Sequence, residues 1–266
     1  MNSTLACSIT AKKLGIPVAH VEAGLRSYDM TMPEEINRKL TDAISDLLFI
    51  PSIDAKDNLR KENIDSDKIY FVGNIMIDSL TKIMGKVDGS YENKLLQKFR
   101  LQCKKYVLVT LHRPSNVDNK DSLEKILNSL NNISQKLPVL FPMHPRTQRN
   151  IKEFGINPVF NKKFIVSEPL KYKEFIVLEK NAGFVLTDSG GIQEETTYFN
   201  VPCLTLRNNT ERPVTILEGT NQLIDVVSIE EKVESVLKGN WKRGEIPELW
   251  DGKTAKRIVE ALKNYR

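Results

Sequence analysis

The sequence has few of the residues that mark a secreted, metal-binding or membrane protein. Its 266 residues include three cysteines, Cys7, Cys103 and Cys203, which are far apart and match no metal-ligand spacing. No run approaches the ~18 apolar residues that a membrane-spanning helix needs, and the first residues have no apolar signal core. We therefore expect a globular, cytoplasmic protein with no membrane partner.

An excess of charge of one sign is also missing. The formal net charge at pH 7 is only +5, and the lysines are spread along the chain without interleaved aromatic residues. Nucleic-acid-binding domains usually gather their basic residues on one face. We therefore expect no nucleic-acid partner.

Several common catalytic motifs are absent too. The sequence contains no Walker motif, no GxGxxG, no HExxH and no GxSxG. These absences argue against a common NTPase, an NAD enzyme, a zinc protease and an α/β-hydrolase.

Short apolar runs alternate with helical segments along the chain. The clearest strands are Leu47–Ile50, Tyr106–Leu111, Phe184–Thr187 and Cys203–Leu206. This alternation predicts an α/β fold built on parallel sheets. A change of pattern after Met84 suggests a domain boundary. The expected ranges are a first Rossmann-like domain over 1–75, a linker over 76–90, a second over 91–246 and a C-terminal helix within 247–266.

The stretch from Ala182 to Arg212 reads as strand, turn, helix and strand. Ser189, Gly190 and Gly191 form the turn that opens the helix. The first N–H groups of a helix lack partners, and glycine lets a phosphate approach the backbone closely. This turn predicts a diphosphate site, with Glu195 one turn further on to bind neutral hydroxyls such as a ribose diol. An ordinary N-cap by Ser189 explains the same residues equally well.

All three histidines, His20, His112 and His144, fall at the carboxyl ends of predicted strands. That edge of an open α/β sheet faces the ligand crevice, although a single histidine is more often structural. The shared position makes His112 and His144 the stronger functional candidates. Arginines suited to phosphate lie close by in sequence: Arg113, Arg146 and Arg212.

Carboxylates gather at predicted loop edges. Glu22 follows a strand, and Glu34 and Glu194 stand at helix starts. Burial can move the pKa of a carboxylate towards 7, as proton transfer at carbon requires, so these residues are acid/base candidates. Glu34 and Glu194 could equally serve to complement helix dipoles.

Seven stretches, each weak alone, form a specific set that covers essentially the whole chain. They are HVEAGLRS (20–27), MPEEINR (32–38), VGNIMIDSL (72–80), LVTLHRPSNVD (108–118), MHPRT (143–147), TDSGGIQEE (187–195) and NTERP (209–213). Together they resemble the non-hydrolysing UDP-N-acetylglucosamine 2-epimerase family. The resemblance implies a glycosyltransferase-B-like α/β architecture: two Rossmann-like domains with a cleft between them, and a final helix that returns to the first domain.

The resemblance also implies an isomerase reaction. UDP is eliminated from UDP-GlcNAc, a glycal intermediate forms, and UDP adds back after the configuration at C2 inverts. The product is UDP-ManNAc, a precursor for surface polysaccharides. The implied partners are UDP-N-acetylglucosamine and UDP, with no metal or other cofactor, and a homodimer is expected.

Site residues carry over position by position. Glu22 and Glu34 resemble the family's acid/base candidates at C2, and His112 resembles the histidine that meets the leaving diphosphate. The substrate-binding candidates are Ser189, Gly190 and Gly191 as the diphosphate cradle, Glu195 as the ribose ligand, Arg212 as a further phosphate or allosteric-region contact, and His144 as a residue lining the cleft.

The sequence departs from the family pattern at its start. The first six residues resemble those that follow an H-G-D-T segment in family members. We therefore expect the first domain to be truncated, without one arginine-bearing loop and one catalytic aspartate, and the activity to be impaired. The alternatives are a non-catalytic UDP-sugar-binding remnant, a hydrolysing epimerase, or a glycosyltransferase of the same fold.

Overall fold

The computed structural model describes residues 2–265, which form two compact units. The first comprises Met1–Lys82, Asn209–Leu217 and Ile246–Arg266, and the second comprises Ile83–Asn208 and Glu218–Glu245. Residues 209–217 thus pack with the first unit, although they lie inside the 91–246 range expected for the second domain. Among the described helices, none is long and apolar enough to cross a membrane.

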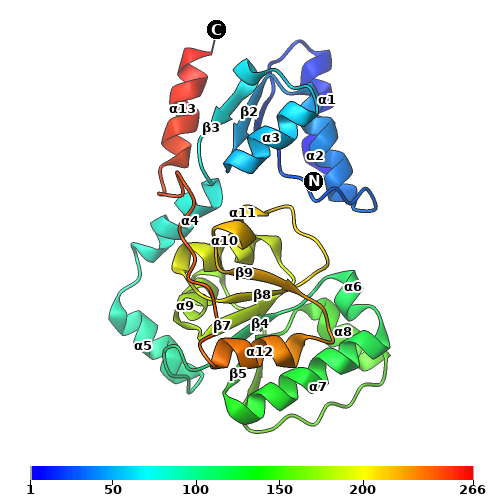
Figure 1. Ribbon diagram of the computed structural model, residues 1–266, viewed down its shortest axis with the longest axis vertical. Helices are drawn as coiled ribbons and strands as arrows, with labels where there is room; N and C mark the ends of the chain where they lie inside the picture. The colour runs from blue at the N-terminus through cyan, green and yellow to red at the C-terminus, as the bar shows by residue number, and fades with distance from the viewer. Residues whose placement is uncertain (1, 266) are drawn as a thin grey trace. The chain divides into compact units, whose positions relative to one another are not determined.

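The first unit is built on a parallel sheet whose described strands run in the order β1-β2-β3 (Figure 1). Its elements are α1 (Asn2–Lys13), β1 (Ala19–Val21), α2 (Pro33–Ile44), β2 (Leu47–Ile50), α3 (Ile53–Lys61), the 3-10 turn η1 (Ser66–Lys68), β3 (Ile69–Phe71), α4 (Ile75–Met84), α11 (Val214–Leu217) and α13 (Thr254–Asn264). Helix α4 ends just beyond the last residue of this unit's first segment.

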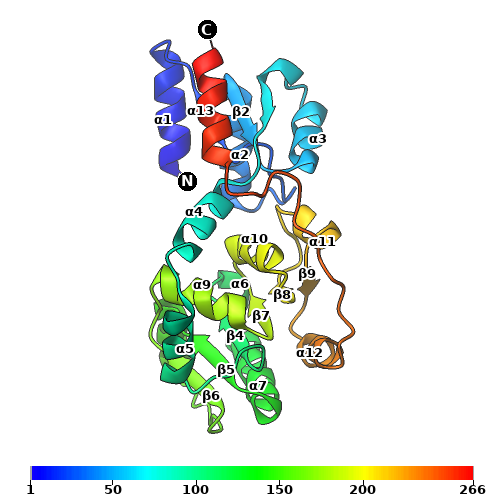
Figure 2. The ribbon, with the colours of Figure 1, turned by 90° about the vertical axis from the view of Figure 1, so that its left-hand side faces the viewer.

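Strand β2 is the centre of the first unit because both of its faces are covered. Alternate residues of β2 pack against α3 on one face and against α13 on the other. Trp250, just before α13, donates its indole N–H to the carbonyl of Pro51 (3.0 Å). The Asp78 carboxylate of α4 accepts the first N–H groups of α13, from Thr254 and Ala255. The last helix therefore completes the core of the first unit (Figure 2).

The second unit is a doubly wound parallel sheet. Its described strands run in the order β6-β5-β4-β7-β8-β9. The chain moves outward from β4 to β6 on one side, then crosses back and continues from β7 to β9 on the other. The elements are α5 (Gly89–Lys98), β4 (Val107–Thr110), α6 (Pro114–Val117), α7 (Lys120–Lys136), β5 (Val139–Pro142), α8 (Pro145–Glu153), β6 (Phe164–Ser167), α9 (Tyr172–Asn181), β7 (Phe184–Thr187), α10 (Gly190–Phe199), β8 (Cys203–Leu206), β9 (Asn221–Ile224) and α12 (Ile229–Leu237).

Both faces of the central strands β4, β5 and β7 are buried, which explains why these strands are almost entirely apolar. Val107 and Val109 of β4 belong to a core shared with α7 and α12, which pack side by side (Figure 1). Leu108 points to the opposite face and packs with α5, α9 and α10. Helices therefore cover the sheet on both faces of β4.

Two elements differ from what the sequence predicts. Helix α8 was not expected, because Pro145–Glu153 has few apolar residues. It forms on local signals: Pro145 at its first position and His144 as its N-cap. The apolar run Ile16–Val21 predicts a strand of six residues, but strand β1 is shorter, since only Ala19–Val21 pairs with β2.

The two sheets should differ in local stability. Among the described strands, β1 pairs with β2 alone and exposes Ala19 and Val21, whereas β4 pairs on both sides and is buried. We expect hydrogen exchange by mass spectrometry to be faster over residues 16–21 than over 106–111, because exchange tracks local opening. Equal protection of the two strands would contradict this expectation.

Candidate functional site

The topology of the second unit defines a position where a ligand crevice is expected. The strand order reverses between β4 and β7, which pair in parallel from Val107 with Phe184 to Thr110 with Thr187. Ligands of doubly wound sheets bind outside the carboxyl ends of the strands at such a switch point. The segments that leave these two strands carry His112 and Asp188.

Asp188 is a buried carboxylate that joins the two segments. It accepts the backbone N–H groups of His112 (2.9 Å) and Arg113 (2.8 Å) and the side-chain amide of Asn116 (3.1 Å). Burial alone would raise the pKa of Asp188, but hydrogen bonds from His112, Arg113 and Asn116 outweigh burial and lower it. Asp188 is therefore an ionised anchor. Sequence reasoning missed this role, although Asp188 directly follows a predicted strand.

His112 and His144 lie together at this edge, with ring centroids 5.6 Å apart. His112 Nδ1 is 2.9 Å from the Asp188 carboxylate, so Nδ1 carries a proton and Nε2 points away from the carboxylate. His144 Nδ1 accepts the backbone N–H of Arg146 (3.1 Å), so its proton is on Nε2. Burial and the charges of His112 and Arg146 lower the pKa of His144. A neutral His144 thus lies beside a histidine that a carboxylate orients.

The Ser-Gly-Gly turn lies at the end of β7, where an anion site was predicted. Ser189 is the N-cap residue of α10, with extended backbone geometry (φ −84°, ψ 137°), but its side chain makes no capping hydrogen bond. Its N–H donates to Thr187 Oγ1 (3.0 Å), which holds the turn against the strand. Ser189, Gly190 and Gly191 are all partly exposed. The geometry thus disfavours an ordinary side-chain cap and resembles the helix starts that bind phosphate.

Glu195 is positioned from the neighbouring helix α9. Glu195 is only 3% exposed, and the Tyr172 hydroxyl donates a hydrogen bond to Glu195 Oε1 (2.6 Å). Burial raises the pKa of Tyr172, and the neighbouring Glu195 raises it further. Sequence reasoning could not find Tyr172, because the partnership joins residues on two different helices.

Glu22 in the first unit has a strained backbone. Its φ of 65° lies in the left-handed region, which non-glycine residues adopt rarely and which costs on the order of 1–3 kcal/mol. The next residues enforce it: Ala23 N–H donates to the Phe49 carbonyl (3.1 Å). Gly24, at φ 78°, lies so close to Ala55 that an added Cβ would be 2.5 Å from the carbonyl oxygen. Strain of this kind is often found at functional sites.

Two buried carboxylates of α2 hold the loop that carries Glu22. Asp42 accepts the N–H of Gly24 (3.0 Å) and pairs with Arg26 (2.7 Å) and with His20 Nδ1 (2.5 Å). His20 is therefore a structural partner of Asp42. Burial alone would lower the pKa of Arg26, but hydrogen bonds and charges from Glu62 and Asp42 raise it.

The second of these carboxylates, Glu35, is fully buried, whereas its neighbour Glu34 is exposed. Glu35 accepts the backbone N–H groups of Ser27 (3.0 Å) and Tyr28 (2.9 Å) and pairs with Arg38 (2.6 Å). Of the two acidic residues that follow Pro33, Glu35 is thus committed to structure and Glu34 is the candidate for chemistry.

Arg212 lies in the first unit, not with the Ser-Gly-Gly turn in the second. It forms an ion pair with Glu211. Arg38 also lies near Glu211 (3.9 Å) and pairs with Glu35, the residue after Glu34. The predicted site residues therefore fall into two groups. The first unit holds Glu22, Glu34 and Arg212; the second holds His112, His144, Ser189, Gly190, Gly191 and Glu195.

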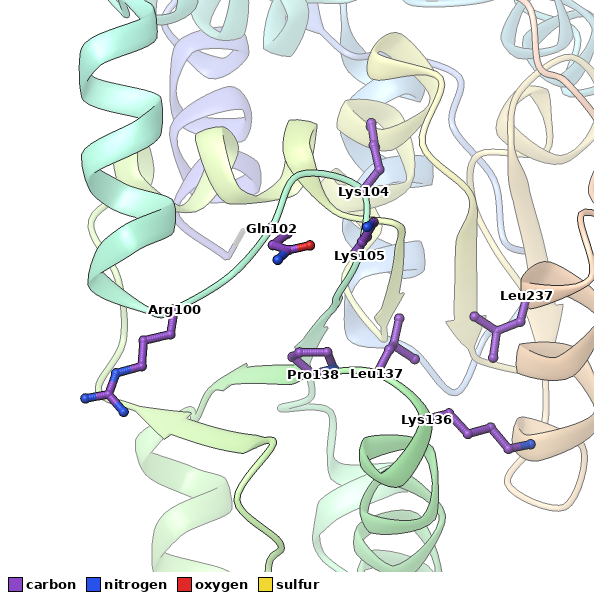
Figure 3. Close-up of a pocket in the computed structure, with 8 residues that line it drawn as sticks. All are labelled: Arg100, Gln102, Lys104, Lys105, Lys136, Leu137, Pro138 and Leu237. Carbon is purple, nitrogen blue, oxygen red and sulfur yellow. The ribbon is translucent and has the colours of Figure 1, made fainter.

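A cavity of about 470 Å³ lies at the opposite, amino edge of the second sheet (Figure 3). It is lined by Arg100, Gln102, Lys104, Lys105, Lys136, Leu137, Pro138 and Leu237. The charged ends of Arg100, Lys104 and Lys136 point in different directions, so they do not converge on a single anion. This cavity is remote from the switch point and holds none of the predicted site residues.

The parallel α/β fold agrees with the predicted glycosyltransferase-B-like class, because solved UDP-GlcNAc 2-epimerase structures match it over the whole chain. A family model described as UDP-N-acetylglucosamine 2-epimerase matches residues 1–263. The chain belongs to this family. A UDP-N-acetylglucosamine 2-epimerase from Methanococcus maripaludis is 45% identical over 98% of this chain and 72% of its own length.

A solved structure and a second relative bear on the ligand. The crystal structure of Methanocaldococcus jannaschii UDP-GlcNAc 2-epimerase in complex with UDP-GlcNAc and UDP has a TM-score of 0.84 and 43% identity; it covers 100% of this chain and 74% of that one. A Pseudomonas aeruginosa protein named UDP-2,3-diacetamido-2,3-dideoxy-D-glucuronate 2-epimerase is 41% identical over 84% of this chain and 61% of its own.

Replacing Asp188 should weaken the second unit in a pH-dependent way. In Asp188→Asn an amide N–H₂ group would face N–H donors, so we expect a loss of about 1–3 kcal/mol at pH 7. The lowered pKa of Asp188 means that its ionised form adds stability above the unfolded-state pKa of about 3.9; this stability is lost as the pH falls through the folded-state pKa. The loss should therefore be smaller at pH 3.

Urea unfolding followed by Trp241 fluorescence measures this loss. Trp241 packs in the second unit, and a Trp250→Phe background removes the tryptophan of the first unit. The control is Asp121→Asn, an exposed aspartate of the same unit, which should change stability by less than about 0.5 kcal/mol. A loss for Asp188→Asn that is as large at pH 3 as at pH 7 would contradict the charge argument.

Proposed function

We propose that this protein is a UDP-N-acetylglucosamine 2-epimerase that interconverts UDP-GlcNAc and UDP-ManNAc. The observation that carries the proposal is the cluster at the switch point of the second unit: a partly exposed Ser-Gly-Gly helix start beside the His112–Asp188 pair. This cluster has the chemistry to hold a diphosphate. The same family resemblance supports a cytoplasmic homodimer.

We assign the diphosphate to the start of α10, where the Ser189 hydroxyl and the amides of Gly190 and Gly191 would hold it, with His112 meeting the oxygen that leaves C1. An imidazole whose Nδ1 is held by a carboxylate can present a proton on Nε2 to a developing phosphate charge. His144 remains neutral beside it and lines the same edge. Glu195 accepts the ribose hydroxyls, and Arg212 in the first unit contributes a further phosphate contact.

We assign the proton transfers at C2 to Glu22 and Glu34. In the elimination, a base takes the C2 proton while the C1–O bond to the diphosphate breaks, which yields a glycal and UDP. In the re-addition, UDP bonds to C1 and a proton is delivered to the opposite face of C2. The strained backbone of Glu22 and the exposure of Glu34 support these roles, since their neighbours Asp42 and Glu35 are occupied with structure.

One specific observation supports an alternative substrate. The Pseudomonas aeruginosa relative is named for inversion at C2 of a UDP-linked 2,3-diacetamido uronate, which is the same chemistry on a different sugar. We favour UDP-GlcNAc because the relatives that match over more of their own length carry that name. Offering both sugars in parallel, with kcat/KM as the measure, would separate the two substrates.

Binding of UDP should depend on the Ser-Gly-Gly turn. Aspartate caps a helix as well as serine does, so Ser189→Asp should preserve the fold while placing a negative charge beside the phosphates. We expect UDP affinity, measured by calorimetry, to fall about tenfold or more, which corresponds to at least ~1.4 kcal/mol. Ser235→Asp, on α12, is the matched control and should bind UDP normally. Unchanged affinity in Ser189→Asp would refute the diphosphate assignment.

Turnover should depend on Glu22 and Glu34 without a matching loss of binding. Removing a positioned acid or base typically lowers the rate by ~10²–10⁴-fold, so Glu22→Gln and Glu34→Gln should lose kcat by that order. Glu248→Gln, an exposed glutamate of the first unit, is the control. In D₂O the wild-type protein should place deuterium at C2 of UDP-ManNAc, which NMR detects.

The same assay separates the alternatives. Free ManNAc with UDP would indicate a hydrolysing epimerase. UDP binding without conversion would indicate a non-catalytic binding protein. Product without deuterium at C2 would contradict elimination and re-addition.

A further inference from the structure

A fully buried glutamate, Glu179, lies on the inner face of α9 and is 0% exposed. It lies against the carboxyl of Glu195 on α10. Apart from that carboxyl, neither oxygen of Glu179 has a hydrogen-bond partner among the described residues. A buried polar group of this kind calls for an explanation, because leaving it unsatisfied costs stability.

The groups around Glu179 offer it no positive charge. The titratable groups that act on Glu179 are Glu195 on α10 and Cys203 on β8. Glu179 acts in turn on Tyr106, which directly precedes β4, and on Tyr172 of α9 itself. The neighbouring Lys180 pairs with Glu92 of α5. Burial raises the pKa of the Cys203 thiol to about 11 and raises the pKa of Tyr106 as well. Neither group therefore adds charge at pH 7.

Glu179 is the member of the carboxyl pair that holds a proton. Burial, and then the adjacent charge of Glu195, raise the pKa of Glu179 well above its usual value. Glu195 is the member that keeps the charge: although burial raises its pKa too, hydrogen bonds from Tyr172 and from Glu179 favour its ionised form. Two buried carboxyl groups in contact cannot both ionise without large repulsion.

We propose that protonated Glu179 is a positioning residue, which donates a hydrogen bond to the Glu195 carboxylate and fixes it for recognition of a vicinal diol. Tyr172 supplies the second donor, through its 2.6 Å hydrogen bond to Glu195 Oε1. Two donors on α9, Tyr172 and Glu179, thus hold the Glu195 carboxylate of α10. The remaining lone pairs of this carboxylate accept hydrogen bonds from the two hydroxyls of the diol. The proposal rests on the proposed function, in which Glu195 binds the ribose of UDP.

The test separates ribose recognition from general packing. UDP and its 2′,3′-dideoxy analogue share the base and the diphosphate, so only UDP reports on Glu195. We expect Glu179→Leu to weaken UDP binding in calorimetry about fivefold, the order of one hydrogen bond, and to leave the analogue unaffected. Glu179→Gln keeps a donor, since its amide N–H₂ can replace the carboxyl proton, and should bind UDP like the wild type at pH 7.

The pH profile gives a second readout that does not require Glu179→Leu to fold. As the pH rises from 6 to 9, loss of the shared proton should weaken UDP binding by the wild type, whereas Glu179→Gln has no such proton and should stay level. Equal losses for UDP and the analogue in Glu179→Leu, or identical profiles for wild type and Glu179→Gln, would overturn the proposal. A wild type that binds UDP no better than the analogue would overturn the ribose role of Glu195 itself, and a wild type that binds neither would overturn the proposed function.

Discussion

The second unit depends on a buried negative charge at the point where its sheet changes direction. Asp188 directly follows β7. The groups that satisfy it, the N–H groups of His112 and Arg113 and the amide of Asn116, instead follow β4. A charged acceptor with several donors is worth more than a neutral hydrogen bond. It therefore fixes the loop after β4 against the turn before α10, and so sets the distance between His112 and the Ser-Gly-Gly turn.

In the first unit, too, buried carboxylates hold a loop by accepting its backbone N–H groups. Asp42 and Glu35 on α2 are fully buried, and both take backbone N–H groups from the loop after β1. Holding that loop from two points allows Glu22 to keep a positive φ that would relax in a free segment. In both units, then, a buried carboxylate orients a neighbour to which we assign chemistry, His112 in one unit and Glu22 in the other.

Features that depend on local sequence could be predicted, whereas features that depend on a partner distant in the sequence could not. Strands such as Phe184–Thr187 and the residues at their carboxyl ends are local signals, and the structure gathers His112, His144 and the Ser-Gly-Gly turn at one edge as expected. The roles of Asp188, Glu35 and Tyr172 were not visible, because each depends on a partner brought near only by the fold. Helix α8 was missed for a different reason: its signals lie in its cap, not in apolar periodicity.

Burial alone does not decide which carboxylates are structural. Asp188, Asp42 and Glu35 are buried with donors around them, and these acids act as anchors. Glu179 is buried as deeply but is met by another acid instead of a donor. A carboxyl in that setting lowers its energy by keeping its proton and becoming a donor itself. The distinction among these acids therefore lies in the partner: the anchors accept hydrogen bonds from backbone and side-chain donors, whereas Glu179, in our proposal, donates one to Glu195.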